Sequence, residues 1–217
     1  MKIIFFDLDN TLYDAEKYYI RAFNTIAGYI FNNFQIEKRK TFEILHENWK
    51  RNTSMYNKIF DDLIKELDLG IEVEKLVSIF NKEKIAKEDL FSDTKAVLEK
   101  LSKEYKIGLI TDGNVLRQKR KIHDCLIEPL LDTIVYTKTL EAKPSPLPFK
   151  HALDQYSVDD IHAFYVADNP MIDFSGAKQA GFTTIRIVRG EFQDVNSDKY
   201  VDYSVFRLDE IYNILEL

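Results

Sequence analysis

After about residue 91 the sequence alternates between short apolar runs and amphipathic segments. The apolar runs are typical of strands: "KIGLIT" at 106–111, "DTIVY" at 132–136, "HAFYVAD" at 162–168 and "TTIRIV" at 183–188. Helical segments are predicted at 92–104, 115–124, 146–155 and 172–180. This alternation favours right-handed βαβ units and a parallel sheet between helices. The predicted fold class is α/β, with a doubly wound, Rossmann-like core.

The N-terminal part of the chain adds one strand and a helical insert to this core. Residues 2–7 are almost continuously apolar, as expected of a strand that is covered on both faces. From Glu16 to about Lys87 the pattern is amphipathic and helical, and no strand is indicated. Further helices are predicted at roughly 37–50, 55–68 and 72–87. We therefore expect an α/β core of 1–14 and 91–217 with an all-helical cap at 15–90.

Composition narrows the classes of function. The 217 residues carry a formal net charge of −6, which argues against a nucleic-acid surface as the main role. The single cysteine, Cys125, excludes an intramolecular disulfide and a cysteine-based zinc site, so we expect a cytoplasmic location. No apolar run is long enough to span a bilayer, and no membrane partner is expected. Periodicity leaves monomer and homodimer open.

Polar side chains follow four of the predicted strands. The first strand runs into Asp7, Asp9 and Thr11, and the second ends in "LITDGN", with Thr111. Lys143 follows the third strand, and "FYVADNPMID" carries Asp168 and Asp173 after the fourth. Because ligands of parallel sheets bind beyond the carboxyl ends of the strands, we expect these side chains to meet in one crevice.

Such a crevice has a defined chemistry. Several carboxylates held close together repel, and a divalent cation removes the conflict. Oxygen ligands without histidine or thiol suit Mg²⁺, which also shares its shell with phosphate. Lys143 and Thr111 would then hold a phosphoryl group beside a carboxylate nucleophile. The residues predict Mg²⁺-dependent phosphoryl transfer on a small phosphorylated substrate.

The sequence resembles the haloacid dehalogenase superfamily in four motifs that occur in order. They are "DLDNT", "LITDG", Lys143 before a proline, and "DNPMID", and the helical insert looks like that superfamily's first-type cap. The resemblance implies that Asp7 attacks phosphorus, Asp9 serves as acid and base, and Thr111 and Lys143 hold the phosphoryl oxygens. It also implies a metal site of Asp7, the Asp9 backbone carbonyl and Asp168, with Asp173 as a ligand or as support for the metal's waters.

Substrate contacts are expected from two further groups of residues. We assign them to the loops that follow the first and second strands and to three tyrosines close to the nucleophile: Thr11, Asp112, Gly113, Asn114, Tyr13, Tyr18 and Tyr19. An acid at Asp9 suits the departure of an alkoxide, which needs a proton, and so favours a phosphatase over a dehalogenase. A phosphomutase with the same residues, and a non-catalytic protein that binds a phosphorylated ligand, stay open as alternatives.

Structural roles compete with several of these assignments. Asp9, Asn10 and Thr11 could form a turn and a helix cap, and "TDGN" could be a strand-to-helix turn. Lys143 could be a solvated loop lysine, and Asp168 and Asp173 could cap a helix. The run "RQKRK" at 117–121 is interpreted as a solvated helix face. Most aromatic residues of the insert are expected in its own interior.

Overall fold

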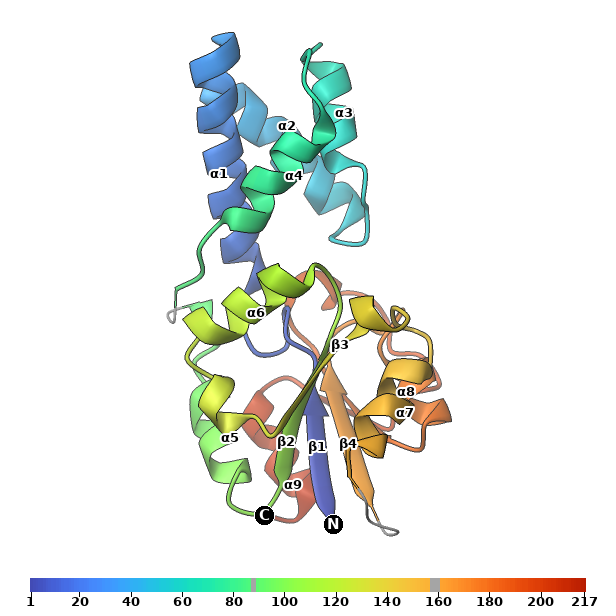
Figure 1. Ribbon diagram of the computed structural model, residues 1–217. Coiled ribbons are helices and arrows are strands. Elements are labelled where there is room, and N and C mark those ends of the chain that lie inside the picture. Colours follow the sequence, from blue (N-terminus) through green and yellow to red (C-terminus); the bar gives the residue numbers. More distant parts are fainter. Residues whose placement is uncertain (87–88, 157–160) are drawn as a thin grey trace. The chain divides into compact units, whose positions relative to one another are not determined.

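The computed structural model describes residues 1–86, 89–156 and 161–217, and Figure 1 shows the elements. The chain divides into an α/β core, Met1–Ala15 with Ile85–Leu217, and a helical unit, Glu16–Lys84. The sequence pattern placed these divisions at 14/15 and 90/91. The segment that starts at Ile85 falls in the core because it pairs with the loop after the first strand. The Asp14 amide donates to the Asp89 carbonyl at 2.8 Å, and Tyr13 and Leu90 form a β-bridge.

The core contains one parallel sheet whose described strands run in the order β3-β2-β1-β4-β5-β6. Their bounds are β1 Lys2–Phe6, β2 Lys106–Thr111, β3 Thr133–Tyr136, β4 His162–Ala167, β5 Thr183–Ile187 and β6 Tyr203–Val205. Every neighbouring pair is parallel, which confirms the doubly wound α/β prediction. Strand β6 was not predicted, because it is short and two of its three residues are exposed, so no apolar run marks it.

Strand β1 lies between β2 and β4, where the strand order reverses direction. Phe6 pairs in register with Leu109 on one side and Val166 on the other. Ile3, Ile4, Phe5 and Phe6 have no exposed surface, as the continuous apolar pattern predicted. The loop that follows β1 therefore emerges at the topological switch point of the sheet, the position where open α/β sheets bind ligands.

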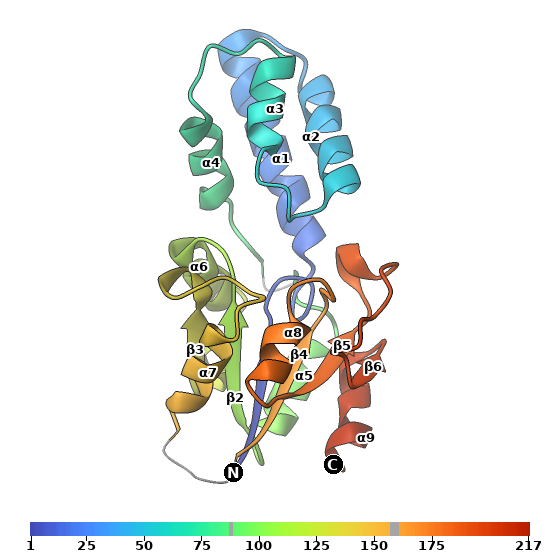
Figure 2. The same cartoon turned by 90° about the vertical axis from the view of Figure 1, so that its right-hand side faces the viewer.

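Helices cover both faces of the sheet. They are α5 Thr94–Leu101, α6 Val115–Asp124, α7 Leu147–Asp154, α8 Phe174–Gln179 and α9 Ile211–Leu215. In Figure 2, α7 and α8 lie in front of the sheet and α5 lies behind it. Phe149 of α7 and Phe174 of α8 pack with Phe5 and Tyr165 in one buried apolar cluster. This cluster anchors the strands whose ends carry the candidate site.

The helical unit contains α1 Ala15–Phe34, α2 Lys38–Asn52, α3 Ile59–Glu66 and α4 Val73–Lys82. Its interior is aromatic, as expected: the Tyr19 ring stacks on Trp49 at 5.0 Å between centroids, and the Phe60 ring lies 5.5 Å from Phe80. Helix α4 ends before residue 87, the predicted end, which itself lies outside the described residues. None of the described helices is long and apolar enough to cross a membrane.

Gly176 of α8 makes room for the loop that carries Lys143. A Cβ atom built on Gly176 would meet the Pro144 carbonyl oxygen at 2.3 Å and the Ser145 carbonyl oxygen at 2.7 Å. Both obstacles are backbone atoms, so a rotamer change cannot relieve the clash. The glycine therefore lets α8 pack directly against this loop.

We expect Gly176→Ala to destabilise the protein by about 1–3 kcal/mol, the usual range for overpacking in a filled interior. The matched control is Gly28→Ala in α1, where nothing lies within 4 Å of the added Cβ. That change should be neutral or stabilise by about 0.5–1 kcal/mol, because alanine is the better helix former. Urea unfolding of both variants tests this, and equal effects would contradict the close-approach argument.

Candidate active site

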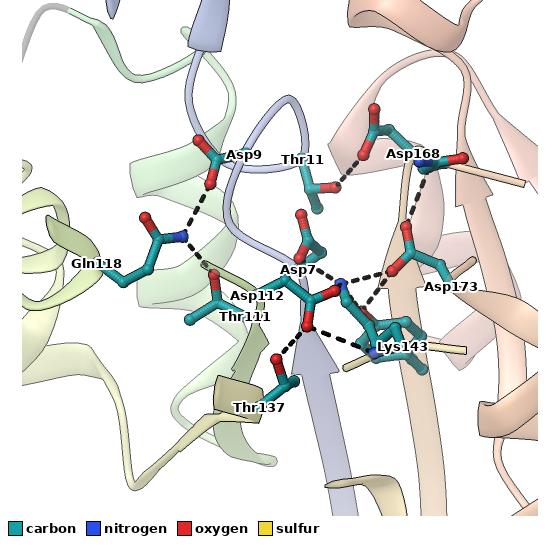
Figure 3. A network of polar contacts seen from close by, with 12 residues as sticks. Asp7, Asp9, Thr11, Thr111, Asp112, Gln118, Thr137, Lys143, Asp168 and Asp173 are labelled. Carbon is teal, nitrogen blue, oxygen red and sulfur yellow. Dashed lines mark hydrogen bonds and ion pairs between the residues drawn. The ribbon is translucent and has the colours of Figure 1, made fainter. Parts of the chain in front are cut away.

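The predicted site residues gather beyond the carboxyl ends of β1, β2 and β4. Figure 3 shows Asp7 after β1, Thr111 at the end of β2, and Asp168 after β4, with Lys143 and Asp173 beside Asp7. The Asp7 amide donates to the Val166 carbonyl at 2.9 Å, which extends the pairing of β1 with β4 into this loop. Asp7, Thr111 and Asp168 are buried. The sheet therefore brings together residues that lie far apart in the sequence.

Lys143 is the central cation of the site. Its Nζ donates to Asp7 Oδ1 at 2.7 Å, to Asp173 Oδ1 at 2.6 Å and to the Tyr165 hydroxyl at 3.1 Å. The side chain is only 2% exposed, so the alternative of a solvated loop lysine is wrong. Burial alone would lower the pKa of Lys143, but the Asp173 and Asp7 charges hold it well above its usual value. Lys143 is therefore a fixed positive charge.

Asp7 carries its charge at a free-energy cost. Burial raises the pKa of Asp7 to about 7, the Asp173 and Asp9 charges add to the rise, and Lys143 opposes it. The Lys143 ion pair thus only partly offsets the desolvation of this carboxylate. A further positive charge at the site would stabilise the ionised form of Asp7.

The Asp168 carboxylate is also buried close to other carboxylates. Burial, then the Asp173 and Asp7 charges, raise the pKa of Asp168 well above its usual value. Its Oδ1 accepts from the Thr11 hydroxyl at 3.4 Å, while its buried Oδ2 has no hydrogen-bond partner among the described residues. No cluster of three histidine, cysteine or acidic side chains forms a ready-made metal site in the described chain. An orphaned carboxylate oxygen next to Asp7 nevertheless fits a hard divalent cation.

Asp173 is committed to positioning other groups. Oδ1 accepts from Lys143 and from the Tyr165 hydroxyl at 3.0 Å, and Oδ2 accepts from the Asn169 amide at 3.1 Å. The side chain makes no capping bond to α8, so the helix-cap alternative is wrong for this residue. Both oxygens of Asp173 are thus engaged, and the carboxylate holds Lys143 in place.

The loop after β1 forms the predicted turn and also carries Asp9, the candidate acid/base residue. Asn10 adopts a positive φ of 58° and its Oδ1 accepts from the Ala15 amide at 3.2 Å, at the start of α1. The Asp9 carboxylate, by contrast, accepts from the Tyr13 hydroxyl, from Lys121 Nζ and from Gln118 Nε2, the last at 2.8 Å. Asn10 therefore serves the turn, and Asp9 is left for the site.

Charge around Asp9 favours its ionised form. Burial would raise its pKa, but the Lys121 charge and the hydrogen bonds from Lys121 and Tyr13 lower it to about 2. Burial lowers the pKa of Lys121 to about 8, against the opposing effect of Asp9. The two aspartates of "DLDNT" thus have pKa values that their surroundings push apart, as suits a pair with different tasks.

Gln118 and Lys121 are site residues that the sequence analysis missed. The interpretation of 117–121 as a solvated face is wrong for both, because Gln118 has no exposed surface and Lys121 is 3% exposed. Their helical spacing to Ile122 and Cys125, at i, i+3, i+4 and i+7, was the signal that could have found them. Because both side chains are polar, their helical spacing was not recognised as that of a buried helix face.

The loop after β2 is the predicted strand-to-helix turn. Gly113 has a φ of +107°, and Asn114 caps α6 by accepting from the Arg117 amide at 3.1 Å. The Asp112 carboxylate accepts from the Thr137 hydroxyl and, at 3.4 Å, from the Lys143 amide. The side chains of Asp112 and Asn114 thus serve the loop, and Thr111 is the residue of this motif whose hydroxyl lies beside Gln118 and Asp9.

Arg189 is a third residue that the sequence analysis missed, and it holds the loop that contains Thr11. Its guanidinium donates to the Thr11 carbonyl, pairs with Asp93 at 3.0 Å and lies 3.8 Å from the centre of the Phe91 ring. The Thr11 side chain is buried, and its hydroxyl is directed at Asp168. Thr11 therefore belongs to the site as a neighbour of the candidate metal ligand.

The three tyrosines predicted to contact substrate make contacts inside the protein. Tyr13 is fully buried; its hydroxyl donates to Asp9, and Lys121 Nζ lies 5.1 Å from the centre of its ring. Tyr18 is 1% exposed, and its hydroxyl donates to the Phe80 carbonyl within the helical unit. Tyr19 stacks on Trp49 in the same interior. The hydroxyls of Tyr13 and Tyr18 are thus engaged inside the protein, and contact of the three tyrosines with substrate stays a prediction.

A parallel sheet of this strand order, with two aspartates after β1 and a buried lysine between carboxylates, defines a class of hydrolases. The family model for haloacid dehalogenase-like hydrolases matches residues 4–187, so the chain belongs to this family. The resemblance seen in the four motifs is confirmed.

Known relatives are phosphatases of nearly the same length. The glyceraldehyde 3-phosphate phosphatase of Methanocaldococcus jannaschii is 30% identical, over 100% of this chain and 97% of that protein. The N-acylneuraminate-9-phosphatase of Rattus norvegicus is 26% identical, over 100% of this chain and 94% of that protein. Among solved structures, a HAD phosphatase from Thermococcus onnurineus has a TM-score of 0.71 at 22% identity and covers 99% of this chain, with 98% of its own length matched.

Proposed function

We propose that the protein is a Mg²⁺-dependent phosphomonoesterase that works through an aspartyl-phosphate on Asp7. The observation that carries the proposal is the Asp7 carboxylate at the switch point of the sheet, ion-paired with buried Lys143 at 2.7 Å, with Asp9 two residues further along the same loop. A carboxylate nucleophile, a fixed cation for phosphoryl oxygens and a separate acid/base group are the parts that such a reaction needs.

In the first step, an Asp7 oxygen attacks phosphorus, and the bond from phosphorus to the substrate's alkoxy oxygen breaks. Asp9 gives that oxygen its proton. Asp9 is ionised in the free protein; the negative charge of the bound phosphate raises its pKa, and Asp9 takes up the proton from solvent before donating it. Lys143 and the Thr111 hydroxyl hold phosphoryl oxygens. In the second step, Asp9 takes a proton from water, which attacks phosphorus, releases inorganic phosphate and restores Asp7.

Asp7, Asp168 and the Asp9 backbone carbonyl would hold the Mg²⁺ ion. The buried Asp168 oxygen without a hydrogen-bond partner and the raised pKa values of Asp7 and Asp168 support this assignment. Bound there, the ion supplies positive charge that neutralises the carboxylates and the phosphate. Asp173 supports Lys143 in this scheme.

The relatives suggest the class of substrate. The names of the two relatives above both describe a phosphate on the terminal carbon of a hydroxylated chain. We propose a primary-alkyl phosphate of a small hydroxylated aldehyde or acid. The alkoxide leaving group of such a substrate is a strong base, which is why a general acid such as Asp9 is needed.

The test is phosphate release from a panel, measured with Mg²⁺ and with EDTA. The panel contains glyceraldehyde 3-phosphate, N-acetylneuraminate 9-phosphate, glucose 6-phosphate, glucose 1-phosphate, a nucleoside monophosphate and p-nitrophenyl phosphate. We expect release with Mg²⁺ and a loss of at least about 100-fold in EDTA, because charge stabilisation by a metal is worth several kcal/mol.

The other outcomes separate the alternatives. Interconversion of the two glucose phosphates without release of phosphate would identify a phosphomutase. Tight binding of phosphorylated compounds without any turnover would identify a non-catalytic binding protein. Release that is equally fast in EDTA would contradict the metal assignment while leaving the hydrolase in place.

A further inference from the structure

The Asp9 carboxylate is held on both of its oxygens by side chains from outside its own motif. Lys121 and Tyr13 donate to Oδ1, and Gln118 donates to Oδ2 at 2.8 Å. Gln118 and Lys121 are one helical turn apart on α6. Figure 3 shows the Gln118 amide between Asp9 and Thr111. The orientation of the acid/base carboxylate is therefore determined by this helix as well as by the β1 loop.

Burial distinguishes these contacts from surface ion pairs. Gln118 has no exposed surface, and the Lys121 side chain is 3% exposed. The Asp9 side chain is 32% exposed. Taking an ammonium group out of water costs several kcal/mol unless the charge is paired. Apolar residues would fill this helix face without that cost, as Ile122 does next to Lys121. A role in packing alone does not account for a buried amide and a buried ammonium here.

Gln118 also acts on the Thr111 hydroxyl. Its Nε2 lies 2.6 Å from Thr111 Oγ1, so the hydroxyl oxygen accepts this hydrogen bond. A threonine hydroxyl has one proton to donate and two lone pairs that accept. When the oxygen accepts from Gln118, its own proton stays available for a phosphoryl oxygen. One amide thus orients both the acid/base group and a phosphate donor.

We propose that Gln118 and Lys121 are positioning residues, which fix the Asp9 carboxylate for proton transfer to the leaving group and orient the Thr111 hydroxyl toward the phosphoryl group. The proposal rests on the phosphatase function proposed above and extends it to two residues outside the four motifs. Without these partners, Asp9 would populate other rotamers, and a misplacement of about 1 Å can lower a rate by about 100-fold.

The dependence on the leaving group tests the proposal. A primary-alkyl phosphate needs a proton on its departing oxygen, whereas p-nitrophenolate departs without one. For Lys121→Met and Gln118→Met we expect kcat/KM to fall by about 30–100-fold with the best alkyl phosphate and by less than about 5-fold with p-nitrophenyl phosphate. Lys121→Arg should recover part of the alkyl-phosphate rate.

The matched control is Lys119→Met, which removes the same charge from an exposed position of the same helix. It should leave both rates unchanged. A second measurement introduces Lys121→Met and Gln118→Met into an Asp9→Asn background. If the two residues act on proton transfer through Asp9, Lys121→Met should lower the alkyl-phosphate rate of that background by no more than about 2-fold, and Gln118→Met by no more than its loss with p-nitrophenyl phosphate, which reports its effect through Thr111.

These measurements distinguish a failure of the positioning role from a failure of the proposed phosphatase function. Equal losses with alkyl and aryl phosphates, or full additivity with Asp9→Asn, would overturn the positioning role and leave the phosphatase function intact. A wild-type protein that hydrolyses neither class would overturn the proposed function, and this inference with it. Gln118→Met changes no charge, so it provides the test should Lys121→Met fail to fold.

Discussion

Asp7→Asn is expected to abolish phosphate release, with a loss of at least about 10⁴-fold in kcat, because a carboxamide cannot act as the nucleophile toward phosphorus. The fold should survive the change. Burial and neighbouring carboxylates raise the pKa of Asp7 to about 7, so a neutral group of the same shape removes a charge that the site accommodates poorly. In EDTA we expect the free energy of unfolding to stay the same or to rise.

The experiment compares phosphate release and urea unfolding of Asp7→Asn with those of Asp154→Asn. Asp154 is an exposed carboxylate at the end of α7, and its replacement should change neither quantity. Residual release by Asp7→Asn within about 10-fold of the wild-type rate would exclude Asp7 as the nucleophile.

Lys143→Met is expected to damage both stability and turnover. The variant leaves Asp7 and Asp173 buried without their shared cation, and loss of one partner of a buried ion pair typically costs about 3–5 kcal/mol. We also expect kcat/KM to fall by at least about 10³-fold, because the charge that holds the phosphoryl oxygens is gone. Urea unfolding in EDTA and phosphate release with Mg²⁺ measure the two effects separately.

A double variant shows whether the ion pair itself carries the stability effect. If it does, Lys143→Met combined with Asp173→Asn will be less destabilised than Lys143→Met alone, because the second change removes a charge that the first left unpaired. Turnover should stay low in both. Additive destabilisation would mean that Lys143 contributes mainly by packing.

The class of fold and the strand ends that carry the polar residues were predictable from the sequence alone. Continuous apolar strands with polar residues at their ends predict a parallel sheet that binds ligands at one edge, because strands buried on both faces have few other arrangements. Asp7, Thr111, Lys143 and Asp168 lie where that reasoning expected them. Periodicity also identified the helical unit, since its aromatic residues recur at helical spacing.

Which of these polar side chains are available for a ligand depends on contacts made in the folded protein. Asp112 is engaged by Thr137, 25 residues away, and Asp173 is engaged by Lys143, 30 residues away. Sequence spacing cannot show these pairs, because a hydrogen bond depends on distances that the fold sets. The same holds for Gln118 and Lys121, whose polar side chains resemble a solvated surface until Asp9, more than a hundred residues earlier in the chain, is placed beside them.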